Sequence, residues 1–336
     1  MVWNPKEQLQ GGKYTIQKVL GQGRFGITYL ARDNKGDGVV IKTLNEGLLN
    51  SLSQIKRERL ESTFRQEASK LQGCQHRHIA QFIEKFPERG LDCIVMEYIA
   101  GSDLASRKHN ILKEKEALRY IQQIGEALIE VHRHDWVHRD VKPANIMLRS
   151  RYGKSEAVLI DFGLVREFYH GLTATTPEKE ATEGFSPIEM YESQAQRGAY
   201  TDVYSLAATL YNLLTGKVPP HAQKLCRAHI PLAPPKTINP KISDRINHAI
   251  MTGMISQSQH RPQTMRKWLD SLGLKPTLIR LPKVESTIWA NWAQVVIAVE
   301  TALLVWIGII PLLQNSSSTP NQLPDAQQES PEANPE

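Results

Sequence analysis

Three glycines near the N-terminus have the spacing of a phosphate-binding loop. They lie in Gly21-Gln22-Gly23-Arg24-Phe25-Gly26, a G-x-G-x-x-G sequence that also opens dinucleotide-binding folds. A dinucleotide site needs a helix directly after the glycines, because the helix N-terminus holds the pyrophosphate. Here the β-prone residues 27–31 follow, so the glycines are expected to join two strands. A hairpin tip without side chains can lay its backbone N–H groups over a triphosphate, although an ordinary glycine-rich hairpin also fits this run alone.

A lysine ends the next apolar stretch, Val39-Val40-Ile41-Lys42. At the end of a strand its charge is expected to point into the cleft beneath the hairpin, where it can reach phosphate oxygens. Such a lysine needs an acidic partner, and Glu67 on the following helix is the candidate. The alternative for Glu67 is a solvated helix face, since several Glu and Arg residues lie nearby.

Two runs farther along the chain favour the phosphate interpretation. They are His138-Arg139-Asp140-Val141-Lys142-Pro143-Ala144-Asn145 and then Asp161-Phe162-Gly163. Their pattern resembles the catalytic loop and the metal-binding loop of protein kinases, H-R-D-x-x-x-x-N and D-F-G. The resemblance extends over residues 14–272, and it includes the glycine loop and the strand lysine. It points to a eukaryotic-like (Hanks-type) bacterial serine/threonine protein kinase.

The resemblance implies a role for each polar residue of the two runs. Asp140 is expected to accept or orient the proton of the substrate hydroxyl, and Lys142 to neutralise charge on the moving phosphoryl group. Asn145 and Asp161 are expected to hold Mg²⁺, since their oxygens are hard ligands suited to a hard cation. The form H-R-D-x-K-P-x-N is typical of Ser/Thr kinases, so the expected substrates are proteins that carry Ser or Thr.

ATP is the nucleotide that the resemblance implies. Met96 matches the gatekeeper, Glu97 and Ile99 match the backbone hydrogen-bonding hinge, and Asp103 matches a ribose contact. Val40 and Thr28 depart from the Ala and Val that are usual at their positions, and both are compatible with ATP. The expected nucleotide-binding residues are Leu20, Gly21, Gln22, Gly23, Arg24, Phe25, Gly26, Ile27, Thr28, Lys42, Glu67, Glu97 and Ile99.

Further residues match the larger lobe of the family. Ser186-Pro187-Ile188-Glu189 departs from the usual A-P-E, but Glu189 is still expected to pair with Arg261. Asp202 resembles the aspartate that braces the catalytic loop backbone. His138 is expected to be a packed structural residue rather than a metal ligand. His132 and His134 are expected to be surface groups at a helix end.

The segment between Gly163 and Glu189 has the features of a regulated activation segment. Thr182 matches the threonine that Ser/Thr kinases place beside the catalytic Asp and Lys. Arg139 precedes the catalytic Asp, as in kinases whose loop is ordered by phosphorylation. We therefore expect autophosphorylation at Thr173, Thr175 or Thr176. A homodimer for trans-autophosphorylation is consistent with this expectation.

The elements that must position these residues change character along the chain. Strands are expected at 14–20, 27–32, 38–44, 79–86 and 91–97, around one helix at 52–72. Helical spacing of apolar residues then predicts helices at 111–134 and 201–215, and an irregular connection at 219–240. The fold class is therefore α+β, with a small β-rich lobe joined to a larger helical lobe near Tyr98–Gly101. The expected organisation is a lead at 1–13, the lobes at 14–97 and 98–272, a linker at 273–288, a transmembrane segment at 289–313 and a disordered tail at 314–336.

Composition and charge exclude several classes. A formal net charge of +6 without a dense basic cluster gives no argument for nucleic acid. The cysteines Cys74, Cys93 and Cys226 form no C-x-x-C pair, so reduced and partly buried thiols are expected rather than a disulfide framework. The tail 315–336, rich in Asn, Gln, Ser, Pro and Glu, cannot bury enough apolar surface to fold.

An apolar stretch at Ala293–Leu313 predicts one transmembrane helix. It is about as long as the roughly 30 Å of bilayer hydrocarbon requires. Its one strongly polar residue, Glu300, costs about 2.5–3.5 kcal/mol at mid-helix, which the surrounding Val, Ile and Leu outweigh. Basic residues lie on the N-terminal side and acids in the tail, so a single-pass protein with a cytoplasmic kinase domain is expected. A buried or surface-lying helix is the alternative.

Two other functions remain to be weighed against a protein kinase. A pseudokinase would keep the fold as a binding or scaffold module, but Lys42, Glu67, Asp140, Asn145 and Asp161 are all present. A small-molecule kinase on a related fold would not be expected to carry Lys142, Thr182 and the Glu189–Arg261 pair.

Overall fold

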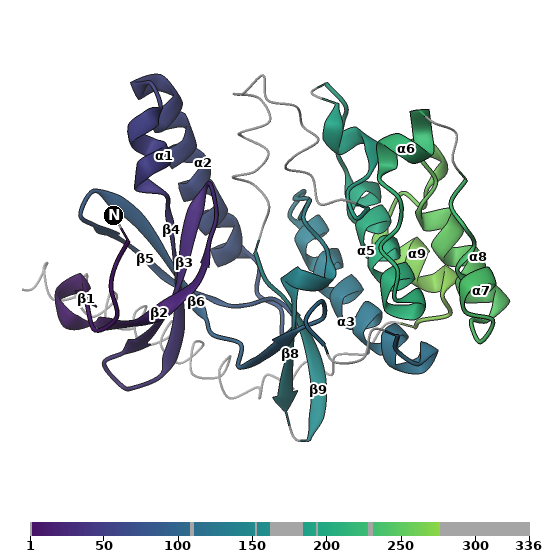
Figure 1. Ribbon diagram of the computed structural model, residues 1–336, viewed down its shortest axis with the longest axis horizontal. Coiled ribbons are helices and arrows are strands. Elements are labelled where there is room, and N and C mark those ends of the chain that lie inside the picture. Colours follow the sequence, from purple (N-terminus) through teal and green to yellow (C-terminus); the bar gives the residue numbers. More distant parts are fainter. Residues whose placement is uncertain are drawn as a thin grey trace, which may run out of the picture. The chain divides into compact units, whose positions relative to one another are not determined.

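Two lobes make up the part of the chain that the computed structural model describes, which is residues 2–107, 111–151, 153–161, 184–192, 194–227 and 231–275. One lobe is rich in strands and the other in helices (Figure 1), so the predicted bilobal α+β architecture is confirmed. The chain divides into one unit at Met1–Pro276 and another at Thr277–Glu336. All described residues belong to the first unit. No helix among them is long and apolar enough to span a bilayer, and the predicted segment 289–313 lies outside them.

A six-stranded antiparallel sheet forms the N-terminal lobe, in the order β1-β2-β3-β4-β6-β5. In β3 and β4 buried residues alternate with half-buried ones, as expected for a sheet that packs one face into a core. Register pairs Thr28 with Lys42, which puts both on the less buried face. The strands are β1 (Gln8–Leu9), β2 (Tyr14–Gln22), β3 (Gly26–Asp33), β4 (Gly38–Leu44), β5 (Phe82–Glu88) and β6 (Leu91–Glu97).

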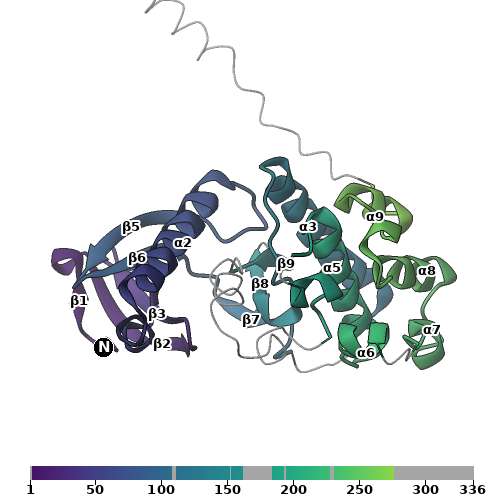
Figure 2. The ribbon, with the colours of Figure 1, turned by 90° about the horizontal axis from the view of Figure 1, so that it is seen from above.

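Helices α1 (Glu46–Ser51) and α2 (Gln54–Gly73) complete this lobe, and α2 runs alongside the sheet (Figure 2). Leu60, Phe64 and Leu71 of α2 are buried at helical spacing and join the lobe's core. Glu67 lies on this same buried face rather than on a solvated one. The residues before position 14, which the sequence sets apart as a lead, contribute β1 and the core side chain Trp3 to the lobe.

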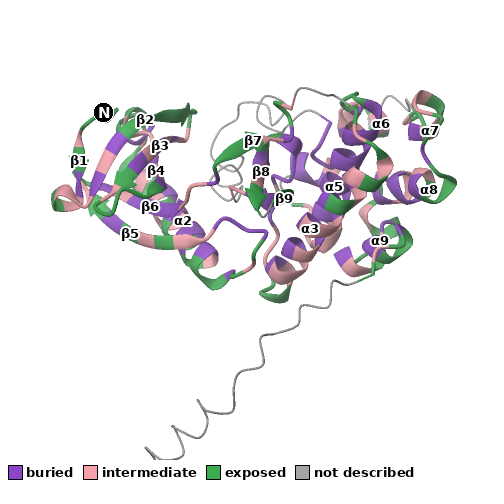
Figure 3. Cartoon of the chain, turned by 90° about the horizontal axis from the view of Figure 1, so that it is seen from below, coloured by how far each residue is buried: buried purple, intermediate pink, exposed green. Residues whose placement is uncertain are grey.

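The C-terminal lobe is built around α5 (Ala199–Thr215), which is buried along almost its whole length (Figure 3). A helix that is buried on nearly every side requires neighbours all round. Those neighbours include α3 (Glu114–Arg133), α7 (Pro235–Ile238), α8 (Asp244–Gly253) and α9 (Met265–Ser271). Gly216 ends α5 in the left-handed conformation, with φ of 70°.

A small sheet, in the order β7-β8-β9, follows the hinge in sequence and packs against α3 through β9 (Figure 1). Its strands are β7 (Gly101–Asp103), β8 (Ile146–Arg151) and β9 (Lys154–Leu159). The catalytic run therefore leads directly into β8, and Asp161 follows β9. Short 3₁₀ helices are found at η1 (Gln10–Gly12), η2 (Pro143–Asn145), η4 (Ile188–Tyr191) and η5 (Ser258–His260).

Most element boundaries lie within three residues of the predicted ones, and the sheet β7-β8-β9 was not predicted; the larger differences concern α1, β5 and the segment 219–240. The helix predicted at 52–72 begins at Gln54. A short helix that was not predicted, α1, precedes it, and Asn45 caps the start of α1. The strand predicted from Ile79 begins at Phe82, since Ile79 instead forms a parallel bridge with Leu159. The segment predicted to be irregular at 219–240 contains two short helices, α6 (Ala222–Arg227) and α7.

Candidate active site

Lys42 lies between two carboxylates at the junction of the lobes. Its ammonium contacts Glu67 Oε1 at 2.9 Å and forms an ion pair with Asp161. Burial opposes the charge of the ammonium, but the Asp161 and Glu67 carboxylates outweigh burial and raise the pKa of Lys42. The lysine is therefore charged at neutral pH. It links β4, α2 and the end of β9 at one point.

The catalytic run is organised by hydrogen bonds to one carboxylate. Lys142 Nζ donates to Asp140 Oδ1 at 3.0 Å, and Asn145 Nδ2 donates to Asp140 Oδ2 at 2.7 Å. Asn145 Nδ2 also donates to the backbone oxygen of Asp140 at 2.8 Å, which folds the run into a tight loop. The three side chains, all nearly buried, are thus held in one orientation.

The backbone brings Asp161 to the same loop. Ile160 N–H donates to the Asn145 carbonyl at 2.9 Å, so the residue after it lies close to the catalytic run. Asp161 adopts a φ of 61°, a conformation that non-glycine residues seldom adopt and that recurs at functional sites. Its side chain is 42% exposed, in contrast to the 1% of Glu67. Phe162 and Gly163 lie outside the described residues.

Asp202, at the start of α5, binds the backbone of the catalytic loop. Its carboxylate accepts from the backbone N–H of both His138 and Arg139 at 2.9 Å, as the sequence predicts. Arg139 has a φ of 69°, so these bonds hold a strained backbone conformation. Burial alone would raise the pKa of Asp202, but hydrogen bonds from His132 and from the His138 backbone lower it.

The prediction for His132 is wrong. Its Nε2 lies 2.8 Å from Asp202 Oδ2 and its side chain is only 13% exposed, because α3 ends against the start of α5. It is therefore a third partner of Asp202 rather than a surface group. His138 is fully buried, as predicted for a packed residue, and burial lowers its pKa.

The glycine hairpin joins β2 and β3, as predicted. Gly23 N–H donates to the Gly26 carbonyl at 2.9 Å and closes its tip. At Gly26 a Cβ atom would lie 2.6 Å from the Thr43 carbonyl oxygen, so no side chain fits there. Ile27, predicted to contact nucleotide, packs its side chain into the lobe's core and leaves only its backbone for such a contact.

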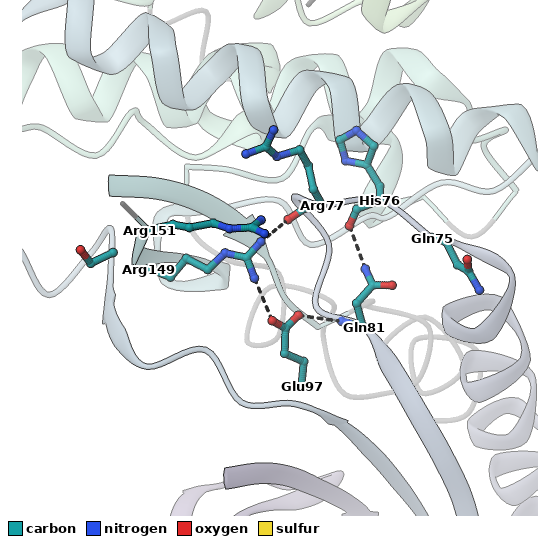
Figure 4. A pocket seen from close by; sticks show the side chains of 8 residues that line it. Gln75, His76, Arg77, Gln81, Glu97, Arg149 and Arg151 are labelled. Carbon is teal, nitrogen blue, oxygen red and sulfur yellow. Dashed lines mark hydrogen bonds and ion pairs between the residues drawn. The ribbon is translucent and has the colours of Figure 1, made fainter. Parts of the chain in front are cut away.

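The hinge residue Glu97 borders a polar hollow of about 620 Å³ (Figure 4). Arg149 Nη1 donates to Glu97 Oε1 at 2.8 Å, and Arg149 Nη2 donates to the Arg77 carbonyl at 2.7 Å. The Arg149 backbone pairs with Gly101 in the small sheet. A Cβ atom at Gly101 would lie 1.8 Å from the Leu148 carbonyl oxygen, so only glycine fits at this position. One residue of β8 therefore contacts both ends of the hinge.

The remaining predicted positions have mixed outcomes. Arg261 and Glu189 form the expected buried pair. The Asp103 carboxylate accepts from the N–H groups of Ala105 and Ser106 at 2.8 Å, so its ribose contact stays a prediction. Thr173, Thr175, Thr176 and Thr182 lie outside the described residues. Among the cysteines, Cys74 and Cys93 are buried free thiols and Cys226 is an exposed one.

Sequence reasoning did not find Asn45 or Arg149. Neither belongs to a motif, because each acts through contacts to a strand or hairpin that is distant in the chain. For Asn45 the available signal is the N-cap pattern, an Asn followed by an acidic residue at the start of a helix.

A two-lobed fold with these side chains at the lobe junction is that of a protein kinase. The family model described as the protein kinase domain matches residues 14–269 of the sequence, and the chain belongs to this family.

The similar proteins with curated descriptions include bacterial serine/threonine-protein kinases. The chain is 30% identical to the serine/threonine-protein kinase PrkC of Bacillus subtilis over 264 residues, which is 75% of this chain and 39% of PrkC. It is 31% identical to the probable serine/threonine-protein kinase pknA2 of Bifidobacterium longum over 219 residues, which is 64% of this chain and 28% of pknA2. The chain thus spans well under half the length of these relatives.

Solved structures share the fold at lower identity. PpkA-294 in its apo form has a TM-score of 0.67 and 24% identity, and the match covers 81% of this chain and 99% of that chain. The PknI kinase domain of Mycobacterium tuberculosis has a TM-score of 0.60 and 23% identity, with 81% and 99% covered.

Proposed function

We propose that this chain is a protein serine/threonine kinase that transfers the γ-phosphoryl group of ATP to Ser and Thr hydroxyls of proteins. The observation that carries the proposal is the ion-paired Lys42, held by Glu67 and Asp161 beside a hydrogen-bonded catalytic loop. The names of the relatives, which are serine/threonine-protein kinases, support the same class.

The nucleotide is proposed to bind between the glycine hairpin and the hinge. Adenine would bond to the backbone carbonyl of Glu97 and the backbone N–H of Ile99. Within the described residues, the Ile99 N–H has no protein acceptor, so it is available to a ligand. Lys42 would bond phosphate oxygens, with Glu67 fixing its position, while the hairpin backbone covers the phosphates.

Asn145 and Asp161 are suited to hold Mg²⁺. Among the described residues, the side-chain hydrogen bonds of Asn145 use its Nδ2, which leaves Oδ1 as a ligand, and the Asp161 carboxylate is partly exposed. Both groups present hard oxygen atoms, the donor set that Mg²⁺ prefers. The chemistry that the ion supplies when bound is the bridging of phosphate oxygens and the neutralisation of their charge.

Asp140 and Lys142 are proposed to act on the acceptor. The hydrogen bonds from Lys142 and Asn145 hold the Asp140 carboxylate in one orientation. A substrate hydroxyl can donate to that carboxylate, which accepts the proton as the oxygen bonds to phosphorus. Lys142 then lies close enough to neutralise charge on the transferred group.

A hollow of about 460 Å³ beside Lys142 is proposed to receive side chains of the protein substrate. Phe185 and Val218 supply apolar walls, and Asn212 supplies a polar group. The hollow is large enough for one or two side chains that flank the phosphoacceptor.

Regulation is proposed to involve autophosphorylation at Thr173, Thr175 or Thr176, with a homodimer as the species that reacts in trans. Arg139 supports this proposal, since a guanidinium beside the catalytic Asp can bind a phosphothreonine. The apolar segment 289–313 is proposed to tether the kinase domain to a membrane as a single-pass protein with that domain in the cytoplasm. The sequence pattern of the segment supports this proposal.

The function is tested by phosphoryl transfer from γ-labelled ATP to the chain itself and to generic protein substrates. Wild-type protein is expected to label both, and Asp140→Ala to label neither while still binding ATP. Equal labelling by Asp140→Ala would refute the assigned base. Labelling of small alcohols in place of proteins would favour a small-molecule kinase, and ATP binding without transfer by the wild type would favour a pseudokinase.

A further inference from the structure

Asn45 contacts the tip of the glycine hairpin at two points. Its side-chain Nδ2 donates to the Gly23 carbonyl at 3.3 Å, and its backbone N–H donates to the Phe25 carbonyl at 2.9 Å. Asn45 directly follows β4, the strand that carries Lys42. The residue therefore lies within the chemistry-bearing region but belongs to none of the motifs.

The same side chain also caps a helix. Asn45 Oδ1 accepts from Gly47 N–H at 3.0 Å and begins α1. An amide suits this arrangement, because its Nδ2 donates while its Oδ1 accepts at the same time. Aspartate would keep the cap but has no proton to donate to the Gly23 carbonyl.

The two contacts fix the direction of peptide groups at the tip. In a trans peptide the carbonyl and the following N–H point in opposite directions. Holding the Gly23 and Phe25 carbonyls on Asn45 therefore directs the N–H groups of Arg24 and Gly26 away from Asn45. Glycines at a tip otherwise leave the backbone free to adopt many conformations.

We propose that Asn45 is a positioning residue for nucleotide phosphates, acting by orienting the backbone N–H groups of the glycine hairpin. This inference rests on the proposed ATP site. It predicts that Asn45 contributes to binding the phosphates and contributes nothing to binding the adenosine part.

The experiment compares Asn45→Asp with Asn50→Asp, the same change at an exposed position of α1. Binding of the Mg²⁺ complex of a non-hydrolysable ATP analogue and binding of adenosine are measured by calorimetry on the full chain. For Asn45→Asp we expect the analogue to bind about 2- to 10-fold more weakly, the range that one hydrogen bond supports. Adenosine affinity should stay at the wild-type value, and Asn50→Asp should change neither.

Two results would overturn the proposal: unchanged affinity of Asn45→Asp for the analogue, or an equal loss for adenosine, which would indicate general damage to the lobe. If Asn45→Asp does not fold, Asn45→Ser replaces it, since serine caps α1 with a side chain one atom shorter. A wild-type protein that binds the analogue but transfers no phosphate would contradict the proposed function and still leave this binding comparison decisive.

Discussion

Arg261 and Glu189 form a two-pronged ion pair in the interior of the C-terminal lobe. Nη1 of Arg261 lies 2.6 Å from Glu189 Oε1, and Nη2 lies 2.9 Å from Oε2. Each residue is only 3% exposed. The guanidinium also donates to the Ser256 carbonyl at 2.8 Å, so the side chain that follows η5 joins η4 to the segment between α8 and η5.

Removing the arginine should therefore destabilise the fold strongly. Arg261→Met leaves the Glu189 carboxylate buried without its cation, which costs about 3–5 kcal/mol in comparable pairs. Urea unfolding should show this loss in the free energy of unfolding. Lys267→Met, which removes an exposed cation on α9, is the control and should change it by under about 0.5 kcal/mol. A loss for Arg261→Met no larger than for the control would contradict the structural role.

Asp202→Asn should impair catalysis more than nucleotide binding. An amide oxygen can replace one carboxylate oxygen, but the second would become an NH₂ group facing a backbone N–H. The strained catalytic loop then shifts, and a displacement of about 1 Å can lower the rate about 100-fold. We expect kcat to fall about 100-fold. The affinity for ATP should stay within about 3-fold of the wild-type value, a change no larger than the loss of one weak hydrogen bond would cause.

The control for Asp202→Asn is Asp244→Asn, the same change at a side chain that is 89% exposed. Steady-state kinetics on a protein substrate measures both variants. A kcat equal to that of the control would show that Asp202 does not determine the geometry of the loop.

Stability should fall as pH drops from about 6.5 to 4, because two buried histidines resist protonation. Burial lowers the pKa of His78 to about 4, and it also lowers that of His138. In this window the unfolded chain binds protons that the folded chain does not, so acid favours unfolding. The stability they contribute is fully present above the unfolded pKa of about 6.5.

His78→Asn isolates one of these histidines. The His78 ring nitrogen Nδ1 lies 2.8 Å from the Ala157 carbonyl, and an asparagine amide can donate there without titrating. The dependence of the free energy of unfolding on pH between 4 and 6.5 should become shallower by up to about one proton. An unchanged slope would mean that His78 titrates normally in the folded state.

Phosphopeptide mapping tests the proposed regulation. Active wild-type protein incubated with ATP should carry phosphate on Thr173, Thr175 or Thr176, and Asp140→Ala should carry none. Phosphate absent from residues 164–188 of active protein would contradict the proposal. Replacing all three threonines by Ala should then lower activity, since Arg139 would lose its anionic partner.

The proposed membrane tether has its own test. Full-length protein should stay with membranes through carbonate extraction, and deletion of 289–313 should release it. Release of the full-length protein by carbonate would contradict the tether. Retention of the deleted protein would mean that another part of the chain binds the membrane.

The residues that the sequence identified are those whose role is encoded locally. Asp140, Lys142 and Asn145 lie within one short loop, so their mutual hydrogen bonds follow from the motif itself. Lys42 and Glu67 pair as predicted, because only the short helix α1 separates the strand and the helix that carry them.

The residues that the sequence missed depend on contacts between elements that are far apart in the chain. Arg149 reaches Glu97 only because β8 pairs with β7 at Gly101, a relation that no local pattern encodes. His132 becomes a partner of Asp202 through the packing of α3 against α5, which reverses its predicted exposure. Helix spacing alone gives the face of a residue but not the side chain it will meet.

Helix α3 takes part in the main apolar core of each lobe. Its earlier residues, such as Tyr120 and Ile124, pack into the core of the C-terminal lobe, whereas Ala127 and Val131 belong to that of the N-terminal lobe. Because one continuous helix contributes side chains to both of these cores, unfolding of either lobe would remove apolar contacts from the other lobe. We therefore expect the two lobes to unfold as one cooperative unit, and we expect neither to be stable as an isolated fragment.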